Sequence, residues 1–542
     1  MEDHKLLEVG WWWLQFVPKY WSLATPTTLV LVVIIFTTFL LKSSLKKKTK
    51  SSPSARPPPG PWKLPVIGNL HQMAVGSPLT HHRLRDLAKQ YGPLMQLKLG
   101  ELSAVVISSP EWAKQFMQTH DLNFATRPFL LAASIIFYDG RDIAFAPHGD
   151  YWRKMRKVVS MELLGARRVK LFRPIMEREV KKLVESISAG GTAAPVNMSR
   201  MFVSLGTTVT SCVAFGKARK DDHQVELLLP LIDQIMETLG GFSLVDLFPS
   251  SKLVGLLTGA HSSLRKVHAA VDVILEAIIS DHVARRSTSS SATNSKKDGD
   301  GEDVVDVLLS IKENNDLGIP FTNEEIKALI LQIFLGGTDT WTVAVEWAMS
   351  ELMKNPWVMK KAQEEVRQVF NAKEKLGAAN DQAWMDQLPY LQLVVKETFR
   401  LHPPGPLLVP RESRETVVID GYQIPATTKV IINAWAIGRD PQHWTEPETF
   451  RPERFLDSSV DFKGMDFQLI PFGAGRRACP GIHYGISIIN IVLANLLYHF
   501  DWELPDGITH QDFDMSEKFG VEVTRKNDLL LIPVPYHTTQ NN

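Results

Sequence analysis

The sequence predicts a mainly α-helical catalytic domain with a small β-sheet subdomain, preceded by a single N-terminal transmembrane helix. Three observations predict this class: helical patterns dominate residues 109–400, one alternating hairpin pattern precedes them, and an uncharged apolar run lies near the N-terminus. Only two cysteines occur, Cys212 and Cys479, so the folded body is expected to face a reducing compartment. A net charge of +1 provides no chain-wide positive field for binding nucleic acid.

The N-terminal segment has the composition of a membrane anchor. Residues 21–41 carry no charge and are long enough to cross the hydrocarbon, which takes roughly 20 residues. Lysines follow directly, so the positive-inside bias predicts residues 1–20 in the lumen and the body in the cytosol. A cleaved signal peptide is the alternative, but the apolar run is too long for one. Residues 42–65 are basic and proline-rich and are predicted to form a hinge, followed by the catalytic domain, residues 66–542.

Local signals place the first elements of the body. Apolar and polar residues alternate over 95–99, Gly100-Glu101 follows, and 104–107 is apolar, which predicts a hairpin. Ser109-Pro110-Glu111 supplies a cap, a first-turn proline and an early acid for a helix. Residues 287–302 are rich in Ser, Lys, Asp and Gly without apolar periodicity and are predicted to form a flexible loop.

The densest chemical signal is Phe-Gly-Ala-Gly-Arg-Arg-Ala-Cys-Pro-Gly at 472–481, directly before an apolar helix predicted over 482–500. Cys479 would lie at the N-terminus of that helix, where unpaired backbone N–H groups and the helix dipole favour a thiolate. Such a thiolate can bind iron. The alternative, a buried cysteine that behaves as a small hydrophobe, is our interpretation of Cys212.

A second signal lies in a long helical pattern. A capping box, Thr322-Asn-Glu-Glu325, starts a predicted helix of about 30 residues, which would be about 45 Å long. Gly336-Gly-Thr-Asp-Thr340 interrupts its pattern. Two glycines cost roughly 2 kcal/mol in a helix interior, which suggests that something approaches the backbone there. The alternative is a core helix with a hydrogen-bonded threonine.

The Phe-x-x-Gly-x-Arg-x-Cys-x-Gly pattern of residues 472–481 resembles the haem-ligand loop of the cytochrome P450 family, and Pro58-Pro-Gly-Pro61 resembles its plant microsomal branch. The resemblance spans nearly the whole chain, because other family landmarks occur in the family's order. It implies haem b with Cys479 as axial ligand, electrons from NADPH through a cytochrome P450 reductase, and cytochrome b5 as a further electron donor. It also implies that the anchor lies in the endoplasmic reticulum membrane.

The same resemblance implies further haem contacts, of which the tryptophan and the arginines would bind propionates. The expected contacts are Arg127, Trp152, Arg156, Arg411, Phe472 and Arg477. Glu397, Arg400 and Arg454 resemble the family's Glu-x-x-Arg and Arg triad, which implies a structural role. Considered alone, Glu397 and Arg400 are spaced like an ordinary surface ion pair.

By resemblance, Thr340 would hydrogen-bond the oxygen substrate and Asp339 would help to deliver protons through water. The family usually has Thr or Ser at the next position, where this sequence has Trp341. One residue turns a helix by about 100°, so Trp341 is expected to face away from the haem. Basic residues around Trp152 suggest a docking patch for an acidic electron donor, although such charges are often only solvated.

Apolar stretches resemble the family's substrate loops and predict a pocket that orients a hydrophobic substrate by shape. The candidate pocket residues are Leu131, Ile136, Phe137, Ile333, Gly336, Leu407, Leu408 and Val409. Buried core is the alternative for each of them. Residues 137–147 are most similar to plant enzymes that hydroxylate or epoxidise terpenoids, so a sesqui-, di- or triterpenoid substrate is expected. An alkaloid, a flavonoid or a fatty acid stays an alternative, as do an isomerase or dehydratase that needs no O₂ and a non-catalytic haem protein.

Overall fold

The computed structural model describes residues 55–190, 194–216, 223–240, 242–291, 302–314, 321–376 and 382–536. Met1–Ala55 and Arg56–Asn542 are separate units. The predicted lumenal segment 1–20, the predicted anchor 21–41 and the predicted hinge up to residue 54 lie outside the described residues.

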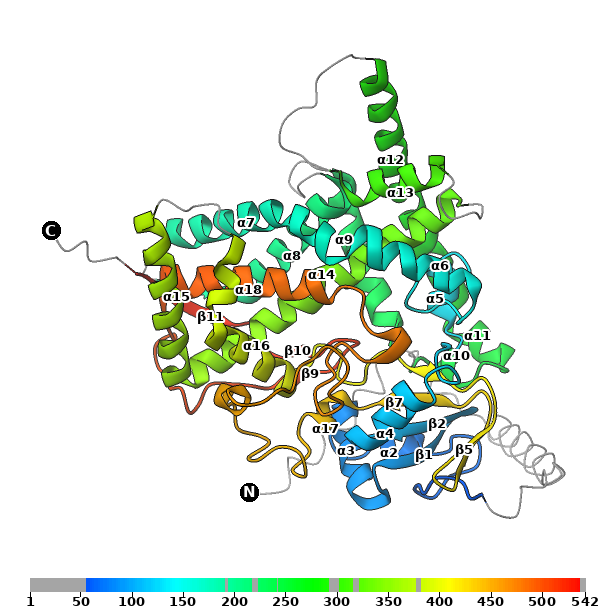
Figure 1. Cartoon of the computed structure of the whole chain (residues 1–542). Coiled ribbons are helices and arrows are strands. Elements are labelled where there is room, and N and C mark those ends of the chain that lie inside the picture. Colours follow the sequence, from blue (N-terminus) through cyan, green and yellow to red (C-terminus); the bar gives the residue numbers. More distant parts are fainter. Residues whose placement is uncertain are drawn as a thin grey trace, which may run out of the picture. The chain divides into compact units, whose positions relative to one another are not determined.

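The described part of the chain is mainly helical, as the sequence predicts (Figure 1). The α-helices are α2 (Leu70–Met73), α3 (Thr80–Tyr91), α4 (Pro110–Lys114), α5 (Leu131–Ile136), α6 (Asp150–Val158), α7 (Ala166–Ala189), α8 (Met198–Phe215), α9 (His223–Thr238), α10 (Leu244–Leu247), α11 (Lys252–Thr258), α12 (Ala260–Ser291), α13 (Val304–Asn314), α14 (Asn323–Lys354), α15 (Pro356–Leu376), α16 (Pro389–Leu401), α17 (Ala434–Ile437) and α18 (Ile482–His499). Ser109 caps α4 by accepting a hydrogen bond from the Trp112 N–H, with Pro110 in the first turn, which confirms the predicted cap.

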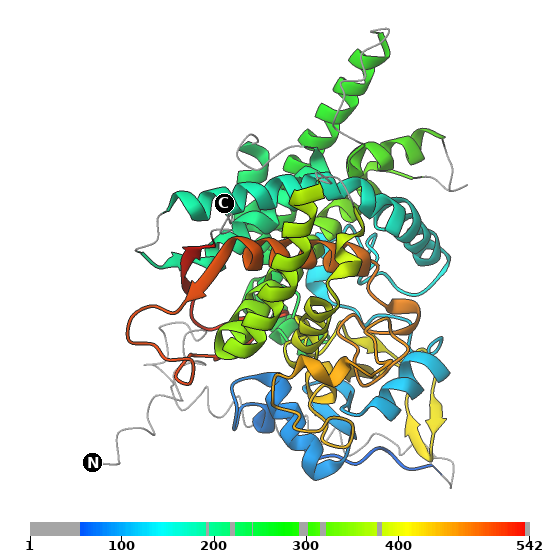
Figure 2. The ribbon, with the colours of Figure 1, turned by 60° about the vertical axis from the view of Figure 1, so that its left-hand side comes forward.

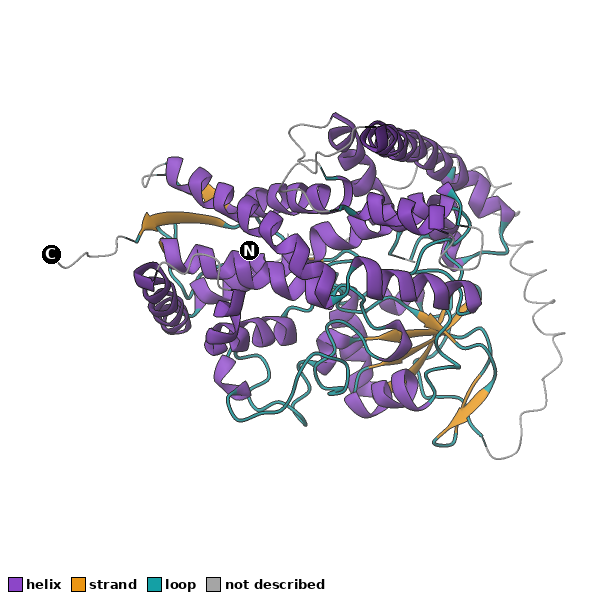
Figure 3. Cartoon of the chain, turned by 45° about the horizontal axis from the view of Figure 1, so that its top comes forward, coloured by secondary structure: helices purple, strands orange, loops and turns teal. Residues whose placement is uncertain are grey.

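The strands form small sheets, the largest of which has four strands (Figure 3). They are β1 (Leu94–Leu99), β2 (Leu102–Ile107), β3 (Val196–Asn197), β4 (Arg411–Glu412), β5 (Val417–Ile419), β6 (Tyr422–Ile424), β7 (Lys429–Ile432), β8 (Phe500–Glu503), β9 (Glu517–Lys518), β10 (Thr524–Arg525) and β11 (Leu530–Pro535). The largest sheet has the order β1-β2-β7-β4, with β1 antiparallel and β7 parallel to β2. The hairpin predicted from the alternating pattern is therefore confirmed as β1 and β2.

Helix α14 is the buried central helix of the larger unit and packs against α8, α16 and α18 (Figure 1). Its predicted capping box is present, since the Thr322 N–H donates to the Glu325 carboxylate at 2.8 Å. The helix continues without a break through Gly336 to Thr340. Helix α8 approaches α14 closely because residue 206 is glycine: a Cβ there would lie 2.9 Å from the Thr338 carbonyl oxygen.

Two described helices, α14 and α18, are long and apolar enough to cross a membrane by length and composition alone. The most apolar stretch is 72% buried inside the protein in α14 and 56% buried in α18. Their burial explains their composition, because a helix that is apolar all round suits the core of a large domain as well as a membrane.

Helix α12 corrects the prediction of a flexible loop over residues 287–302. The helix continues to Ser291, and its C-terminal part extends beyond the neighbouring helices (Figure 2). The prediction is wrong for residues 287–291, because adding a residue to an existing helix is easy whereas starting a helix is costly. Residues 292–301 lie outside the described residues.

Candidate active site

The Cys479 loop is held by backbone hydrogen bonds ahead of α18. The Cys479 N–H donates to the Phe472 carbonyl at 2.9 Å, and the Gly481 N–H donates to Cys479 Sγ at 3.3 Å. Gly475 has a φ of +66°, and a Cβ there would lie 2.1 Å from the Met117 carbonyl oxygen. Only glycine fits this position, because a side chain would meet both strained backbone and a fixed atom. Cys479 therefore lies just before α18, as predicted.

The Cys479 thiol lies deep in the protein and still borders open space. Burial raises the pKa of the thiol, whereas the hydrogen bond from the Gly481 N–H and the nearby Arg156 guanidinium lower it. The residue nevertheless has an exposed surface. Together these observations indicate that Sγ faces an internal hollow and not the outer surface. The predicted stabilisation of the thiolate is present, but it is smaller than the effect of burial. Cys212 is buried, as predicted.

One face of α14 also borders open space. Gly336 is exposed, and a Cβ there would have no neighbour within 4 Å. Thr340, one turn later, is half-exposed and donates from its hydroxyl to the Gly336 carbonyl at 2.9 Å. The next residue, Gly337, lies on the buried side of the helix, where Tyr484 of α18 lies 3.9 Å from the position of a Cβ, so α14 and the start of α18 are close at these glycines. Gly336 thus leaves the strip that it shares with Thr340 without side-chain cover.

Trp341 faces away from this open strip, as the helical step predicts. Its side chain is 2% exposed in the hydrophobic core, and its indole N–H donates to the Gly337 carbonyl at 2.8 Å. The same carbonyl accepts a hydrogen bond from the Thr210 hydroxyl at 2.7 Å. Trp341 therefore fills a core position in which a Thr or Ser would leave space.

Asp339 lies beside other acidic side chains. Burial, followed by repulsion from Asp233 of α9, raises its pKa to about 6. Burial, followed by repulsion from Asp339, raises the pKa of Glu522 well above its usual value. The residue after Glu522 is fixed on two sides, because the Val523 carbonyl accepts from the Trp347 indole at 2.8 Å and its N–H donates to the Pro404 carbonyl at 2.9 Å.

Sequence reasoning missed Asp233 and Glu522. Neither belongs to a recognisable motif, and they are separated from Asp339 by about 100 and 180 positions along the chain. The only signal was the polarity of Asp233, which interrupts a mainly apolar run over residues 227–236. Only the tertiary structure brings these carboxyl groups close enough to affect one another.

Three of the predicted propionate contacts form a buried cluster of positive charge. Burial, followed by repulsion from Arg477 and Arg411, lowers the pKa of Arg127 well below its usual value. Burial and repulsion from Arg411 also lower the pKa of Arg477, to about 9. Asp121 pairs with Arg411 at 2.7 Å, while Asp142 is buried and burial raises its pKa to about 6. The described residues therefore leave the cluster with an excess of positive charge, which suits anionic groups.

Backbone carbonyls accept most of the hydrogen bonds from these side chains. The acceptors are the carbonyl oxygens of Ala144, Val409 and Pro410 for Arg127, of Ala125, Ile143 and Ala146 for Arg477, and of Ile143 for Trp152. The Arg477 guanidinium lies 4.2 Å from the centre of the Trp152 ring. Arg156 makes no hydrogen bond or ion pair with the described residues. Phe472 packs against Phe399, with ring centres 5.0 Å apart.

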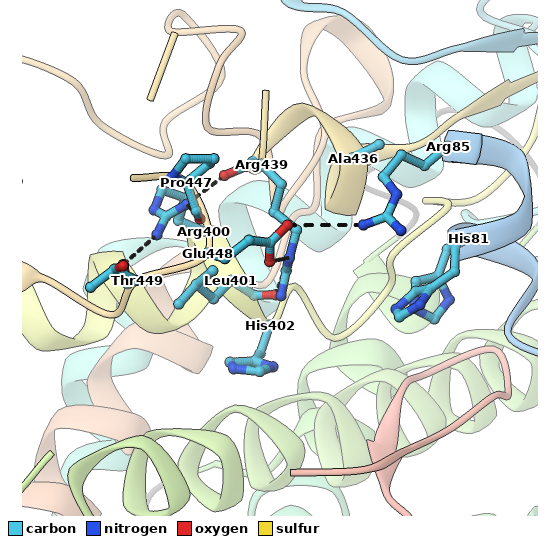
Figure 4. Close-up of polar contacts among 12 residues, drawn as sticks. His81, Arg85, Arg400, Leu401, His402, Ala436, Arg439, Pro447, Glu448 and Thr449 are labelled. Carbon is cyan, nitrogen blue, oxygen red and sulfur yellow. Dashed lines mark hydrogen bonds and ion pairs between the residues drawn. The ribbon is translucent and has the colours of Figure 1, made fainter. Parts of the chain in front are cut away.

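Glu397, Arg400 and Arg454 form a buried ionic network, as expected of the predicted triad. Arg400 donates to both carboxylate oxygens of Glu397, at 2.7 and 2.8 Å, and Arg454 donates to one of them at 2.8 Å. Figure 4 shows Arg400 directed at Pro447 and Thr449, whose carbonyls accept at 2.6 and 3.1 Å. Glu397 and Arg400 are 0% exposed, so this pair is part of the core and not an ordinary surface pair.

The candidate pocket residues divide into three groups by their exposure. Gly336, Leu408 and Val409 have accessible surface, and Val409 is 38% exposed. Ile136 and Phe137 are 0% exposed, and Leu407 packs in the core beside the four-stranded sheet. For Ile136 and Phe137, the structure supports the alternative of buried core, because a side chain without accessible surface cannot contact a ligand without rearrangement. Leu131, Ile333 and Leu407 are intermediate cases, at 8%, 7% and 8% exposed.

The fold and this site together indicate the class of protein to which the chain belongs. A cysteine loop before an apolar helix, an open strip on a long central helix and a buried excess of positive charge fit a haem that carries two propionates and a thiolate ligand. The sequence profile of the family "Cytochrome P450" matches residues 57–532. The chain belongs to the cytochrome P450 family, and it is therefore a haem-thiolate monooxygenase that takes electrons from a redox partner.

Similar proteins support the same family and differ in their substrates. Desmethyl-deoxy-podophyllotoxin synthase of Sinopodophyllum hexandrum is 49% identical over 90% of this chain and 93% of its own length. Premnaspirodiene oxygenase of Hyoscyamus muticus is 46% identical over 90% and 94%, and tabersonine 6,7-epoxidase isoform 1 of Catharanthus roseus is 49% identical over 88% and 91%. A zebra fish cytochrome P450 structure with progesterone shares the fold, with a TM-score of 0.69 at 24% identity over 84% of this chain and 99% of that one.

Proposed function

We propose that Cys479 binds the haem iron and that the chain hydroxylates or epoxidises a hydrophobic terpenoid. The observation that carries this proposal is the Cys479 thiol, which faces an internal hollow just before α18. The bound haem would supply the O₂ chemistry. Arg127, Arg411 and Arg477 would bind the propionates, whose negative charge would balance the buried positive cluster, and Arg156 and Trp152 lie beside them.

Thr340 and Asp339 would handle protons at this site. A carboxyl group with a pKa of about 6 exchanges its proton readily near neutral pH, which suits Asp339 to general acid catalysis. The Thr340 hydroxyl donates to the Gly336 carbonyl, so its oxygen stays available to accept a hydrogen bond from water. These two groups support an O₂-dependent reaction over an isomerase or dehydratase, which needs no proton delivery to O₂.

The direct test is turnover in microsomes that contain a cytochrome P450 reductase. NADPH and O₂ consumption are measured with a terpenoid panel, together with product formation by mass spectrometry. We expect substrate-dependent consumption of both and a product heavier by one oxygen atom. Product formation without O₂ would indicate an isomerase or dehydratase, and haem binding without any turnover would contradict the proposed enzyme activity.

The pocket residues Leu408 and Val409 have accessible surface and are apolar, which supports an apolar substrate. The similarity to premnaspirodiene oxygenase supports the same class of substrate. An amine-bearing alkaloid is a second candidate, because Asp233 and Glu522 lie near Asp339, and tabersonine 6,7-epoxidase is also similar. Burial favours the neutral form of Glu522, which is compatible with a neutral substrate, whereas a cationic amine would favour its ionised form.

Glu522→Gln separates the two substrate classes. Binding is measured by the shift of the haem Soret band with a neutral terpenoid panel and with a panel of hydrophobic amines. A hydrogen bond to a charged group contributes about 1.5–3 kcal/mol, so losing one weakens amine binding by about tenfold or more. For a terpenoid enzyme, Glu522→Gln leaves the affinity for terpenoids nearly unchanged. The exposed Glu415 supplies the matched control, Glu415→Gln, which changes neither.

We also propose that residues 21–41 anchor the protein in the endoplasmic reticulum membrane. A second proposal is that an NADPH-dependent reductase docks near α6. Arg153, Lys157 and Arg167 are exposed and would complement an acidic donor.

The anchor is tested by deleting residues 1–50, which should release the body from the bilayer while it still binds haem. Loose attachment can persist, because Leu256 and Leu257 of α11 are 79% and 76% exposed. Failure of the shortened chain to bind haem would contradict the independence of the body from the anchor.

A further inference from the structure

His282, Asp303 and Asp306 converge where α12 meets the start of α13 (Figure 1). His282 lies in α12, Asp303 directly precedes α13, and Asp306 lies in its first turn. One ring nitrogen and one oxygen of each carboxylate all lie within 4.8 Å of one another. His282 and Asp303 are 1% and 5% exposed, and Asp306 is half-buried.

The hydrogen bonds of His282 fix the position of its proton. Nδ1 lies 2.7 Å from the carbonyl oxygen of Ile278, one helical turn earlier. Because a carbonyl oxygen can only accept, Nδ1 carries the hydrogen. In the neutral ring Nε2 then has a lone pair, and this Nε2 lies 3.0 Å from Asp303 Oδ2. Two lone pairs cannot hydrogen-bond, so either a metal ion lies between these atoms or a proton does, held by the ring or by the carboxyl group.

The second carboxylate favours the metal ion. Asp303 Oδ1 accepts from the Asp306 backbone N–H at 2.9 Å, which holds Asp303 as a helix cap with Oδ2 toward His282. The Asp306 carboxylate makes no hydrogen bond or ion pair with any residue that the structure describes. The nearby Arg286 is paired with Glu313 at 2.8 Å. A proton between His282 and Asp303 would satisfy Asp303 alone, whereas a metal ion would use both carboxylates.

We propose that His282 Nε2 and the carboxylates of Asp303 and Asp306 bind one divalent first-row metal ion such as zinc. A histidine that binds a metal usually donates its other ring N–H to a carbonyl or carboxylate, as His282 does to Ile278. One imidazole and two carboxylates form a donor set that zinc accepts, with water completing the coordination. The ion would join α12 to α13, the helices that flank residues 292–301.

A second histidine–carboxylate cluster has the opposite hydrogen-bond arrangement and supplies a control. Nε2 of His81 and Nε2 of His82 approach the same carboxylate oxygen of Glu517, at 2.7 and 3.2 Å. Both nitrogens therefore donate to the carboxylate, and neither offers it a lone pair. Nδ1 of His81 is buried and has no hydrogen-bond partner among the described residues. The Glu517 carboxylate is therefore satisfied by the two Nε2 hydrogens, without a metal ion.

The test is zinc retention by the untagged, full-length holoenzyme. The protein is treated with EDTA, dialysed against zinc chloride and then against buffer, and zinc is measured by mass spectrometry relative to haem. Asp306→Asn removes one ligand without breaking any side-chain hydrogen bond among the described residues, so its haem content should equal that of the parent. His82→Gln is the matched control at the other cluster.

We expect about one zinc ion per haem in the parent and in His82→Gln, and about one fewer in Asp306→Asn. Zinc should also raise the thermal midpoint of the parent but not of Asp306→Asn, since an ion that binds only the folded state stabilises it. Equal zinc in the parent and Asp306→Asn would overturn the proposal and leave His282 and Asp303 joined by a hydrogen bond alone. Loss of zinc in His82→Gln alone would overturn it as well, because the ion would then lie at Glu517.

Discussion

Replacing Glu397 by glutamine should destabilise the protein severely, although the two side chains have almost the same shape. One carboxylate oxygen of Glu397 accepts from Arg400, Arg454 and the Arg451 backbone N–H, each at 2.8 Å. The other oxygen accepts from Arg400 Nε at 2.7 Å. A glutamine can place its carbonyl oxygen where the first carboxylate oxygen lies. Its amide N–H₂ group would then face the Arg400 Nε–H, and two donors cannot hydrogen-bond to each other.

The expected loss follows from the burial of this network. Arg400 is 0% exposed, so removing the Glu397 charge leaves a guanidinium in the core without its carboxylate. Breaking a buried ion pair by removing one partner costs about 3–5 kcal/mol. Domains are typically stable by about 5–15 kcal/mol, so Glu397→Gln should remove a large part of the free energy of unfolding. The expected consequence is a much lower urea midpoint and a lower haem content at expression temperature.

The assay is urea unfolding of the holoenzyme, followed by haem absorbance and far-ultraviolet circular dichroism. Glu185→Gln is the matched control, because Glu185 is 63% exposed and lies 3.9 Å from Lys181 in a surface pair. Such a pair contributes at most about 1 kcal/mol, so the control should unfold close to the parent midpoint. A midpoint for Glu397→Gln equal to that of the control would refute the argument from buried charge.

Four further predictions concern the proposed site. Cys479→Ala should abolish activity and the thiolate-type red-shifted band of the reduced carbon-monoxide complex, and persistence of that band would contradict the ligand assignment. Thr340→Ala should keep its haem content but lower product formed per NADPH consumed, by up to about 10²-fold, whereas Trp341→Ser should have the smaller effect because Trp341 is buried away from the open strip. Unchanged coupling in Thr340→Ala would remove the hydroxyl from the mechanism. Gly475→Ala should prevent haem incorporation, measured by absorbance, because its Cβ would lie 2.1 Å from a carbonyl oxygen. The pKa of Asp339 is raised to about 6 in the folded protein, so the unfolded chain loses this proton at a lower pH than the folded chain. Stability therefore falls as pH rises from about 4 to about 6, and this group causes no further loss above that range. Asp339→Asn should remove this part of the pH dependence of the urea midpoint, and identical pH profiles would contradict the raised pKa.

The parts of the fold that sequence predicted well are those that local chemistry decides. The cap at Ser109 and the capping box at Thr322 each depend on residues three positions apart, and the hairpin β1–β2 depends on one continuous stretch, residues 94–107. The rotation per residue of a helix predicts that Trp341 and Thr340 point to different sides of α14, and the burial of Trp341 in the core agrees with that difference. The loop over 287–302 was wrong in its first five residues, because composition alone does not tell where an established helix stops.

The rest of the site depends on long-range burial, which the sequence does not encode position by position. Ile136 and Phe137 have the composition of a pocket, yet their 0% exposure follows from neighbours that are distant in the chain. The helix N-terminus at Cys479 favours the thiolate as predicted, but burial outweighs it and raises the thiol pKa. The acidic partner of Asp339, Glu522, lies in the connection between β9 and β10, which no local motif links to α14.

The two histidine–carboxylate clusters show why residue types alone do not identify a metal site. Both bring imidazole nitrogens and carboxylate oxygens within 4.8 Å of one another, so composition and distance do not distinguish them. The difference lies in which ring nitrogen carries hydrogen. At His282 the Ile278 carbonyl takes up the Nδ1 hydrogen and leaves an Nε2 lone pair facing a carboxylate. At His81 and His82 the Nε2 hydrogens are used by Glu517 itself. A backbone carbonyl one turn away, which every helix supplies, therefore decides whether the same two side-chain types bind each other or bind an ion.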